Sequence, residues 1–272
     1  MTKLFGVIGD PIAHSLSPLI HKGWMRDHHL AADYLGLEVP EGEFPDAMKT
    51  LTRKGFKGLN VTMPHKLAAL EFASDVTSRA GKIGAVNTLW REGDGYWHGD
   101  NTDAPGFHAA LLPLVDAPLE GQTALVFGAG GAARGILYAL DGAGVRVVLA
   151  NRTVSRAAGL LGDYPGRGHT AIDLAAGLAM SNEVDFVVNT TSVGYAGQSL
   201  DLPMSDGRLF YDISYGPASK PVLPPAREKG WRTADGLSML VYQAAFAFER
   251  WFDIMPDVEK GMQRCRAVLE VA

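Results

Sequence analysis

The feature that most constrains the fold is the segment TALVFGAGGAARGILYAL, residues 123–140. Residues 123–127 form a short apolar run typical of a buried strand, and residues 134–140 are typical of a helix. Between them, Gly128, Gly130 and Ala133 fit the pattern GxGxxA. A strand joined to a helix by this turn predicts a doubly wound parallel sheet that binds a dinucleotide.

Each small residue of the turn has a steric reason. Gly128 allows a tight turn, Gly130 lets the backbone approach a pyrophosphate, and Ala133 permits close packing of the helix on the strand. The amides of the turn and of the first helical turn would then face the phosphates. The predicted phosphate-binding residues are Gly128, Ala129, Gly130, Gly131 and Ala132. The alternative is a glycine turn that only connects two elements.

The end of the next predicted strand, residues 145–151, bears on the choice of cofactor. An NAD site usually carries Asp or Glu there, bonded to the ribose 2′-hydroxyl. This chain has Asn151, Arg152 and Thr153 instead. A guanidinium suits a 2′-phosphate, Thr153 can donate its hydroxyl, and Arg156 can assist. The sequence therefore predicts NADP(H), unless these arginines only solvate a loop.

Strands and helices alternate along the chain, which predicts an α/β protein with parallel sheets. The loop at 116–121 and the change to long apolar helices near 236 suggest boundaries. We predict two domains. An open, mostly parallel α/β substrate domain is expected at 1–104 plus 237–272, and a doubly wound Rossmann NADP-binding domain at 105–236. The expected strands are 4–9, 34–39, 58–61, a hairpin of 84–90 with 96–101, 123–127, 145–151, 184–189 and 209–213.

Composition excludes several classes of protein. With 272 residues and 47% hydrophobic content, the chain can bury a large core. Its net charge is −5 and it has no basic run, which argues against nucleic acid or an anionic membrane as a partner. No apolar stretch approaches membrane-spanning length, so we expect a soluble, cytoplasmic protein with a small-molecule ligand. Cys265 is the single cysteine and fits a packed helix face, and no metal-binding pattern is present.

The segment NVTMPHK, residues 60–66, contains a lysine in an unfavourable place. A strand ends near Val61, and Pro64 suits the first position of a helix, so Lys66 falls in the first helical turn. The positive end of the helix dipole disfavours an ammonium there by roughly 0.3–1 kcal/mol. Residues that break a local rule in this way are often functional.

Polar residues gather at the predicted strand ends, where open α/β sheets bind ligands. Asn60 and Thr62 share a face of one strand, and Asn87 and Asp103 follow other strands. Many hydroxyl partners with one carboxylate and one lysine fit a small polyhydroxylated substrate. The turn-forming tendency of such residues is the alternative.

Two serines precede the first helix in HSLSP, residues 14–18. Ser17 suits the N-cap, with Pro18 at the first helical position. Ser15 is not needed as a cap, and two hydroxyls beside a helix N-terminus could bind a carboxylate. The sequence favours capping and anion binding equally.

Taken in order, seven motifs resemble the shikimate dehydrogenase family over essentially the whole chain: HSLSP, NVTMPHK, GAVNT, GDNTD, GAGGAAR, NRT and DGLSMLVYQAAFAFERW. The resemblance implies reversible, NADP-dependent reduction of 3-dehydroshikimate to shikimate in a cleft between two domains. It also implies a role in chorismate and aromatic amino acid biosynthesis, in a monomer or a homodimer.

The resemblance also implies a role for each matching residue. Lys66 would be the catalytic acid/base and Asp103 its partner, and Ser15 and Ser17 would hold the substrate carboxylate. The ring substituents would contact Asn60, Thr62, Asn87, Tyr215 and Gln243. The cofactor would also be lined by Ile213, Gly236 and Met239.

Some positions depart from the family's usual residues and leave substrate preference open: Lys22, Ser78, Ser192, Tyr195, Gly216 and Lys220. One alternative is a relative that acts on quinate or an amino analogue of shikimate. Another is a non-catalytic sensor of the metabolite and the nucleotide, and a third is a dinucleotide-binding scaffold.

Overall fold

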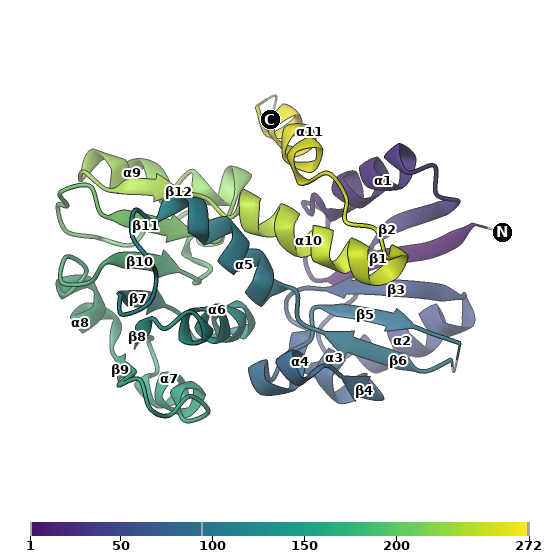
Figure 1. Cartoon of the computed structure of the whole chain (residues 1–272), viewed down its shortest axis with the longest axis horizontal. Helices are drawn as coiled ribbons and strands as arrows, with labels where there is room; N and C mark the ends of the chain where they lie inside the picture. The colour runs from purple at the N-terminus through teal and green to yellow at the C-terminus, as the bar shows by residue number, and fades with distance from the viewer. Residues whose placement is uncertain (1, 94, 271–272) are drawn as a thin grey trace. The chain divides into compact units, whose positions relative to one another are not determined.

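The computed structural model describes residues 2–93 and 95–270. The chain divides into two compact units, whose elements are labelled in Figure 1. Unit 1 is Met1–Gly106 together with Leu240–Ala272, and unit 2 is Phe107–Met239. No helix in the described ranges is long and apolar enough to cross a membrane.

Unit 1 is built on a six-stranded sheet with the order β2-β1-β3-β5-β6-β4. Strand β5 is antiparallel to β3 and to β6, while the pairs β1–β2, β1–β3 and β4–β6 are parallel. This confirms the open, mostly parallel sheet. The predicted hairpin is formed by β5 and β6, but its first strand begins at Thr88 and not at residue 84, and Asp94 lies outside the described residues. The strands are β1 (Lys3–Gly9), β2 (Ala32–Glu38), β3 (Phe56–Val61), β4 (Asp75–Val76), β5 (Thr88–Arg91) and β6 (Trp97–Asp100).

The helices of unit 1 pack against this sheet or against one another. One buried cluster includes Ile8 and Leu59 from the sheet and Phe44 and Met48 from α2. The C-terminal helix α11 packs on α1, and its Cys265 is buried, which raises the pKa of that thiol to about 11. The helices are α1 (Ser17–Asp27), α2 (Phe44–Arg53), α3 (Lys66–Phe72), α4 (Ser78–Ile83), α5 (Asp103–Leu111), α10 (Leu237–Phe252) and α11 (Val258–Leu269), of which α5 and α10 continue into unit 2.

Unit 2 contains a parallel sheet with the order β12-β11-β10-β7-β8-β9. The chain starts in the middle at β7, winds outward to β9, and then returns to wind the other way, which is the doubly wound topology that the glycine turn predicts. The strands are β7 (Thr123–Phe127), β8 (Arg146–Ala150), β9 (Thr170–Ile172), β10 (Phe186–Asn189), β11 (Leu209–Asp212) and β12 (Arg232–Ala234). The α-helices between β7 and β12 are α6 (Gly131–Gly142), α7 (Val154–Leu161), α8 (Leu174–Ala179) and α9 (Leu223–Glu228).

Several short elements were not predicted, for a physical reason. Strands β9 and β12 have three residues each at the two edges of the sheet, and neither contains a fully buried residue. The central strands β7 and β10 instead bury four residues in a row. Three residues without a buried apolar run give no clear strand signal in the sequence.

Two predicted helix starts are wrong by one or two residues. Helix α3 begins at Lys66, and Pro64 lies before it in a turn in which His65 N donates to Thr62 O at 3.0 Å. Helix α1 begins at Ser17 itself, because Leu16 already has helical backbone angles. The Ser17 side chain therefore does not cap the helix.

Candidate active site

The lysine and the carboxylate singled out by the sequence form an ion pair in unit 1. Lys66 Nζ donates to Asp103 Oδ2 at 2.5 Å, and the two side chains are only 14% and 8% exposed. Each is the first residue of its helix, α3 and α5 respectively. The helix dipole favours the carboxylate at that position and disfavours the ammonium, so the carboxylate offsets the unfavourable placement of Lys66.

Asn87 holds the Asp103 carboxylate in one orientation. Its Nδ2 donates to Asp103 Oδ1 at 2.8 Å, and its Oδ1 accepts from Thr102 N at 2.7 Å. The same Nδ2 lies 3.4 Å from Oε1 of Gln243, on α10. Both oxygens of Asp103 are therefore bound, one by Lys66 and one by Asn87. The structure brings four predicted site residues from four segments of unit 1 together.

Asn60 joins this group through Thr88, which is fully buried. Asn60 Nδ2 donates to Thr88 Oγ1 at 3.3 Å, and Thr88 Oγ1 donates to Asn87 Oδ1 at 3.0 Å. Thr62 is half-buried just beyond the end of β3, in the turn that leads to α3. Asn60, Asn87 and Asp103 thus form one polar cluster with Thr88.

The two serines at the start of α1, Ser15 and Ser17, have roles different from those the capping argument assigned. Ser15 Oγ accepts from Ser17 N at 3.3 Å, so the serine judged unnecessary for a cap makes the local contact. Ser17 is buried, and its hydroxyl interacts with the phenol of Tyr34.

Tyr34 is a residue that the sequence did not single out. It is fully buried in β2, and its hydroxyl donates to Asn60 Oδ1 at 2.7 Å. Burial raises its pKa well above the usual value, so the phenol keeps the proton that it donates. Tyr34 therefore links Asn60 to Ser17. An aromatic residue in a predicted strand signals packing, and nothing in the sequence marks its hydroxyl.

His21 packs against this cluster, and its burial predicts that the stability of the protein depends on pH. Its ring is fully buried and stacks on Tyr34 with centroids 4.3 Å apart. Burial lowers the pKa of His21 to about 3, which nearby Asn60 only partly offsets. Below pH 6.5 the unfolded chain binds a proton at this position and the folded chain does not. The contribution of His21 to stability is therefore full well above pH 6.5 and is lost as the pH falls from 6.5 toward 3, by up to about 1.4 kcal/mol per pH unit.

The test compares wild type with His21→Phe, which retains a ring for stacking but cannot titrate. Urea unfolding followed by tryptophan fluorescence at pH 6.5 and 5 should show wild type losing about 1.6 kcal/mol more than His21→Phe. Asp212, whose pKa burial raises to about 6, acts in the opposite direction, so only the difference between the two proteins is informative. The control is His14→Gln at an exposed position, and equal pH dependence of all three proteins would contradict the prediction.

The predicted phosphate-binding turn is in unit 2, between β7 and α6. Gly128 has φ +102°, and a Cβ there would lie 2.5 Å from Thr190 Oγ1, so only glycine fits. A Cβ on Gly130 would instead meet no atom within 4 Å, which leaves open space beside the helix N-terminus. No side chain caps α6 and no acidic residue lies in its first turn. These features fit the pyrophosphate of a dinucleotide, held by the amides of residues 128–132.

The end of β8 fits a phosphate as well. Arg152, Thr153 and Arg156 are all exposed just beyond it. Asn151 Nδ2 donates to Thr153 O at 2.9 Å, which closes the turn before α7. The residues 151–153 include no carboxylate that would repel a 2′-phosphate.

The residues predicted to line the rest of the cofactor site lie near the end of β11. Ile213 follows that strand directly, and Gly236 N donates to Ser214 O at 2.9 Å, which brings residues 213 and 236 together. Met239 is buried. Tyr215, which was predicted to contact the substrate, is half-buried and also belongs to unit 2. The turn is held by Asp212, whose carboxylate accepts from Ser214 N at 3.1 Å and Ser214 Oγ at 2.8 Å.

Known families match the chain along most of its length. Residues 7–89 match the shikimate dehydrogenase substrate binding domain, residues 114–196 match shikimate / quinate 5-dehydrogenase, and residues 236–266 match the shikimate 5'-dehydrogenase C-terminal domain. The shikimate dehydrogenase (NADP(+)) of Hyphomonas neptunium is 48% identical over 271 residues, covering 99% of each chain. The chain belongs to the shikimate dehydrogenase family.

Solved structures of the shikimate dehydrogenase family have the same fold. The Aquifex aeolicus enzyme has a TM-score of 0.86 and 34% identity, covering 97% of this chain and 98% of that one. The Thermus thermophilus enzyme in complex with NADP(H) and shikimate has a TM-score of 0.85 and 36% identity, covering 98% and 99%. The family resemblance of the seven motifs is thereby confirmed.

Proposed function

We propose that the protein catalyses the reversible, NADPH-dependent reduction of 3-dehydroshikimate to shikimate. The observation that carries the proposal is the buried Lys66–Asp103 pair within a cluster of amide and hydroxyl groups. The activity is the one named for the Hyphomonas relative, and the Thermus structure holds NADP(H) and shikimate. Residues 1–104 plus 237–272 would form the substrate-binding catalytic domain, and residues 105–236 the NADP-binding domain.

Lys66 is the proton donor and acceptor in this proposal. NADPH, when bound, supplies the hydride. Negative charge that develops on the substrate oxygen is stabilised by a donor within hydrogen-bonding distance, and the Lys66 ammonium is that donor. Asp103 holds the ammonium in place, and Asn87 in turn holds Asp103. In the reverse direction, Lys66 accepts the proton from the hydroxyl.

The remaining polar groups would bind the substrate. Ser15 and Ser17, beside the N-terminus of α1, would hold its carboxylate. The ring substituents would contact the residues predicted from the sequence, namely Asn60, Thr62, Asn87, Tyr215 and Gln243. Asn60 is buried, and its Nδ2 makes only weak contacts of 3.3–3.4 Å. This side-chain amide therefore retains the capacity to bind a substrate hydroxyl.

The cofactor would be held entirely by residues of unit 2. Residues 128–132 would bind the pyrophosphate, and Arg152 would bind the 2′-phosphate with Thr153 and Arg156, next to Asn151. The nicotinamide would lie against Ile213, Gly236 and Met239. All the residues named here come from one chain, so the proposed function applies equally to a monomer or a homodimer. We also propose that the protein acts in the cytoplasm, as the sequence predicts.

The deciding assay is the loss of NADPH absorbance with 3-dehydroshikimate as substrate. NADH and 3-dehydroquinate are compared in parallel, and the amino analogue of shikimate is tested in the oxidative direction with NADP⁺. We expect the highest kcat/KM with NADPH and 3-dehydroshikimate. A higher value for quinate-type or amino substrates would replace the proposed substrate, while binding without turnover would favour a metabolite sensor.

A further inference from the structure

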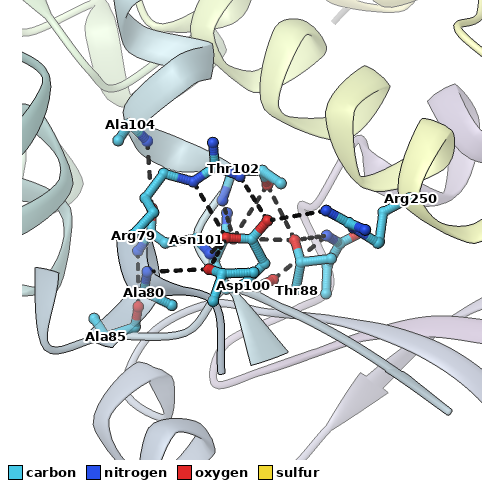
Figure 2. A network of polar contacts seen from close by, with 12 residues as sticks. Arg79, Ala80, Ala85, Thr88, Asp100, Asn101, Thr102, Ala104 and Arg250 are labelled. Atoms are coloured by element: carbon cyan, nitrogen blue, oxygen red, sulfur yellow. Dashed lines mark hydrogen bonds and ion pairs between the residues drawn. The ribbon is translucent and has the colours of Figure 1, made fainter. Parts of the chain in front are cut away.

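Asp100 is a buried carboxylate for which the proposed reaction has no use. It is the last residue of β6 and only 1% exposed. Figure 2 shows the donors that converge on it. Arg79 binds it through Nε at 3.2 Å and Nη2 at 2.5 Å, Thr77 Oγ1 donates at 2.6 Å, and Asn101 N donates at 2.7 Å.

The cost of burying this carboxylate calls for an explanation. A buried ion pair often stabilises a fold no better than apolar residues of similar volume would. A carboxylate whose hydrogen bonds are all formed does fix the positions of its donors, because each donor has to lie at a set distance and direction from it. Asp100 lies three residues before Asp103, so the geometry that it defines is that of the segment leading to the proposed acid/base pair.

The connection from Asp100 to Asp103 runs through Asn101, which follows it. The Asn101 amide is bound by Asp100, and its side chain accepts from Ala104 N at 3.3 Å and donates to Ala85 O at 3.0 Å. The bond to Ala104 N satisfies an amide in the first turn of α5, the helix that begins at Asp103. The position of that first turn is therefore tied to the Asp100 carboxylate.

A second connection runs from Asp100 to α10. Arg250 Nη2 lies 4.0 Å from Asp100 Oδ2, and its guanidinium lies 5.0 Å from the ring centroid of Trp90. Arg250 is seven residues after Gln243, so the two side chains share a face of α10. Contacts at Arg250 thus help to set the rotation of the helix that presents Gln243 to Asn87.

We propose that Asp100 is the positioning residue of the active site, acting through Asn101 on Asp103 and through Arg250 on Gln243. The kinetic part of this inference rests on the proposed function, whereas the structural part does not. Arg79 and Thr77 hold the carboxylate, and Asp100 transmits their constraint to the two segments. Both oxygens of Asp100 are already bound by protein donors, so its proposed effect on catalysis is indirect.

The test uses the full-length variant Asp100→Asn, which keeps the size of the side chain and removes its charge. Small shifts of reacting groups are costly, so we expect kcat per folded molecule to fall about tenfold while KM for NADPH stays unchanged. Arg250→Gln should instead raise KM for 3-dehydroshikimate a few-fold with little change in kcat. Asp100→Asn should thus change kcat, and Arg250→Gln should change KM for 3-dehydroshikimate. A merely structural role would lower the melting temperature of each variant and leave kcat and KM unchanged.

Amide hydrogen exchange provides a readout that does not depend on activity. Asp100→Asn should speed exchange at the amides of Thr102 and Ala104, which are bonded to Asn87 and Asn101. The matched control is Asp27→Asn, which removes an arginine–carboxylate pair of 2.6 Å with Arg264 between α1 and α11 in the same unit. It should change neither exchange at these amides nor kcat.

Each outcome of these experiments decides the inference. Unchanged exchange and unchanged kcat in Asp100→Asn would overturn it. If Asp100→Asn does not fold, the variants Arg79→Gln and Thr77→Val are used in its place. Normal amide exchange and normal kcat in both of these variants would also overturn the inference. Should wild type fail to turn over 3-dehydroshikimate, the proposed function falls, and the exchange data alone decide whether Asp100 positions this segment.

Discussion

Lys66→Ala is expected to reduce 3-dehydroshikimate about 10²–10⁴-fold more slowly than wild type, with a smaller change in KM. The ammonium is the only group of the Lys66–Asp103 pair that can donate a proton while Asp103 is ionised. Its removal leaves the charge that develops on the substrate oxygen without this donor. The measurement is steady-state NADPH oxidation over a range of substrate concentrations.

Two further variants separate chemistry from folding in this experiment. Lys66→Gln retains an N–H donor but cannot deliver a proton, so it should be nearly as slow as Lys66→Ala. Lys49→Ala removes an exposed lysine paired with Asp46 in the same unit and should have normal activity. Because Asp103 is 8% exposed and loses its cation in the Lys66 variants, the folded fraction has to be measured for each. Activity within a few-fold of wild type in folded Lys66→Ala would exclude Lys66 as the acid/base.

Arg152→Ala is expected to lower kcat/KM for NADPH by about 10²-fold and to leave that for NADH nearly unchanged. A guanidinium can donate two charge-assisted hydrogen bonds to a phosphate, together worth up to about 3 kcal/mol. The ribose hydroxyl of NADH has no charge for Arg152 to bind. The measurement is the ratio of the two kcat/KM values for each protein.

The control for this prediction is Arg266→Ala, which removes an arginine of α11 that is 54% exposed. It should leave the ratio of NADPH to NADH at the wild-type value. Equal losses with both cofactors in Arg152→Ala would contradict the 2′-phosphate role and favour a general effect on the turn after β8. If kcat/KM for NADPH falls only when Arg152 and Arg156 are both replaced, the 2′-phosphate is bound by the two arginines together.

The sequence by itself determined the central strands and the glycine turn of unit 2, because their signals are local. The positive φ at Gly128 and the short turn into α6 are properties of adjacent residues, and so is the absence of a carboxylate at residues 151–153. The buried apolar runs of β7 and β10 identified the central strands for the same reason. The three-residue edge strands β9 and β12, which lack such runs, were missed.

Only the tertiary structure decided how the polar residues of unit 1 pair with one another. Lys66 and Asp103 are 37 residues apart, and Asn87 and Gln243 are 156 apart, so no local pattern states that they meet. Tyr34 joins Ser17 to Asn60 by the same kind of long-range contact, and Ser15, not Ser17, makes the local bond before α1. The physical reason is that a hydrogen bond depends on the direction of both partners, and packing of the whole unit sets those directions.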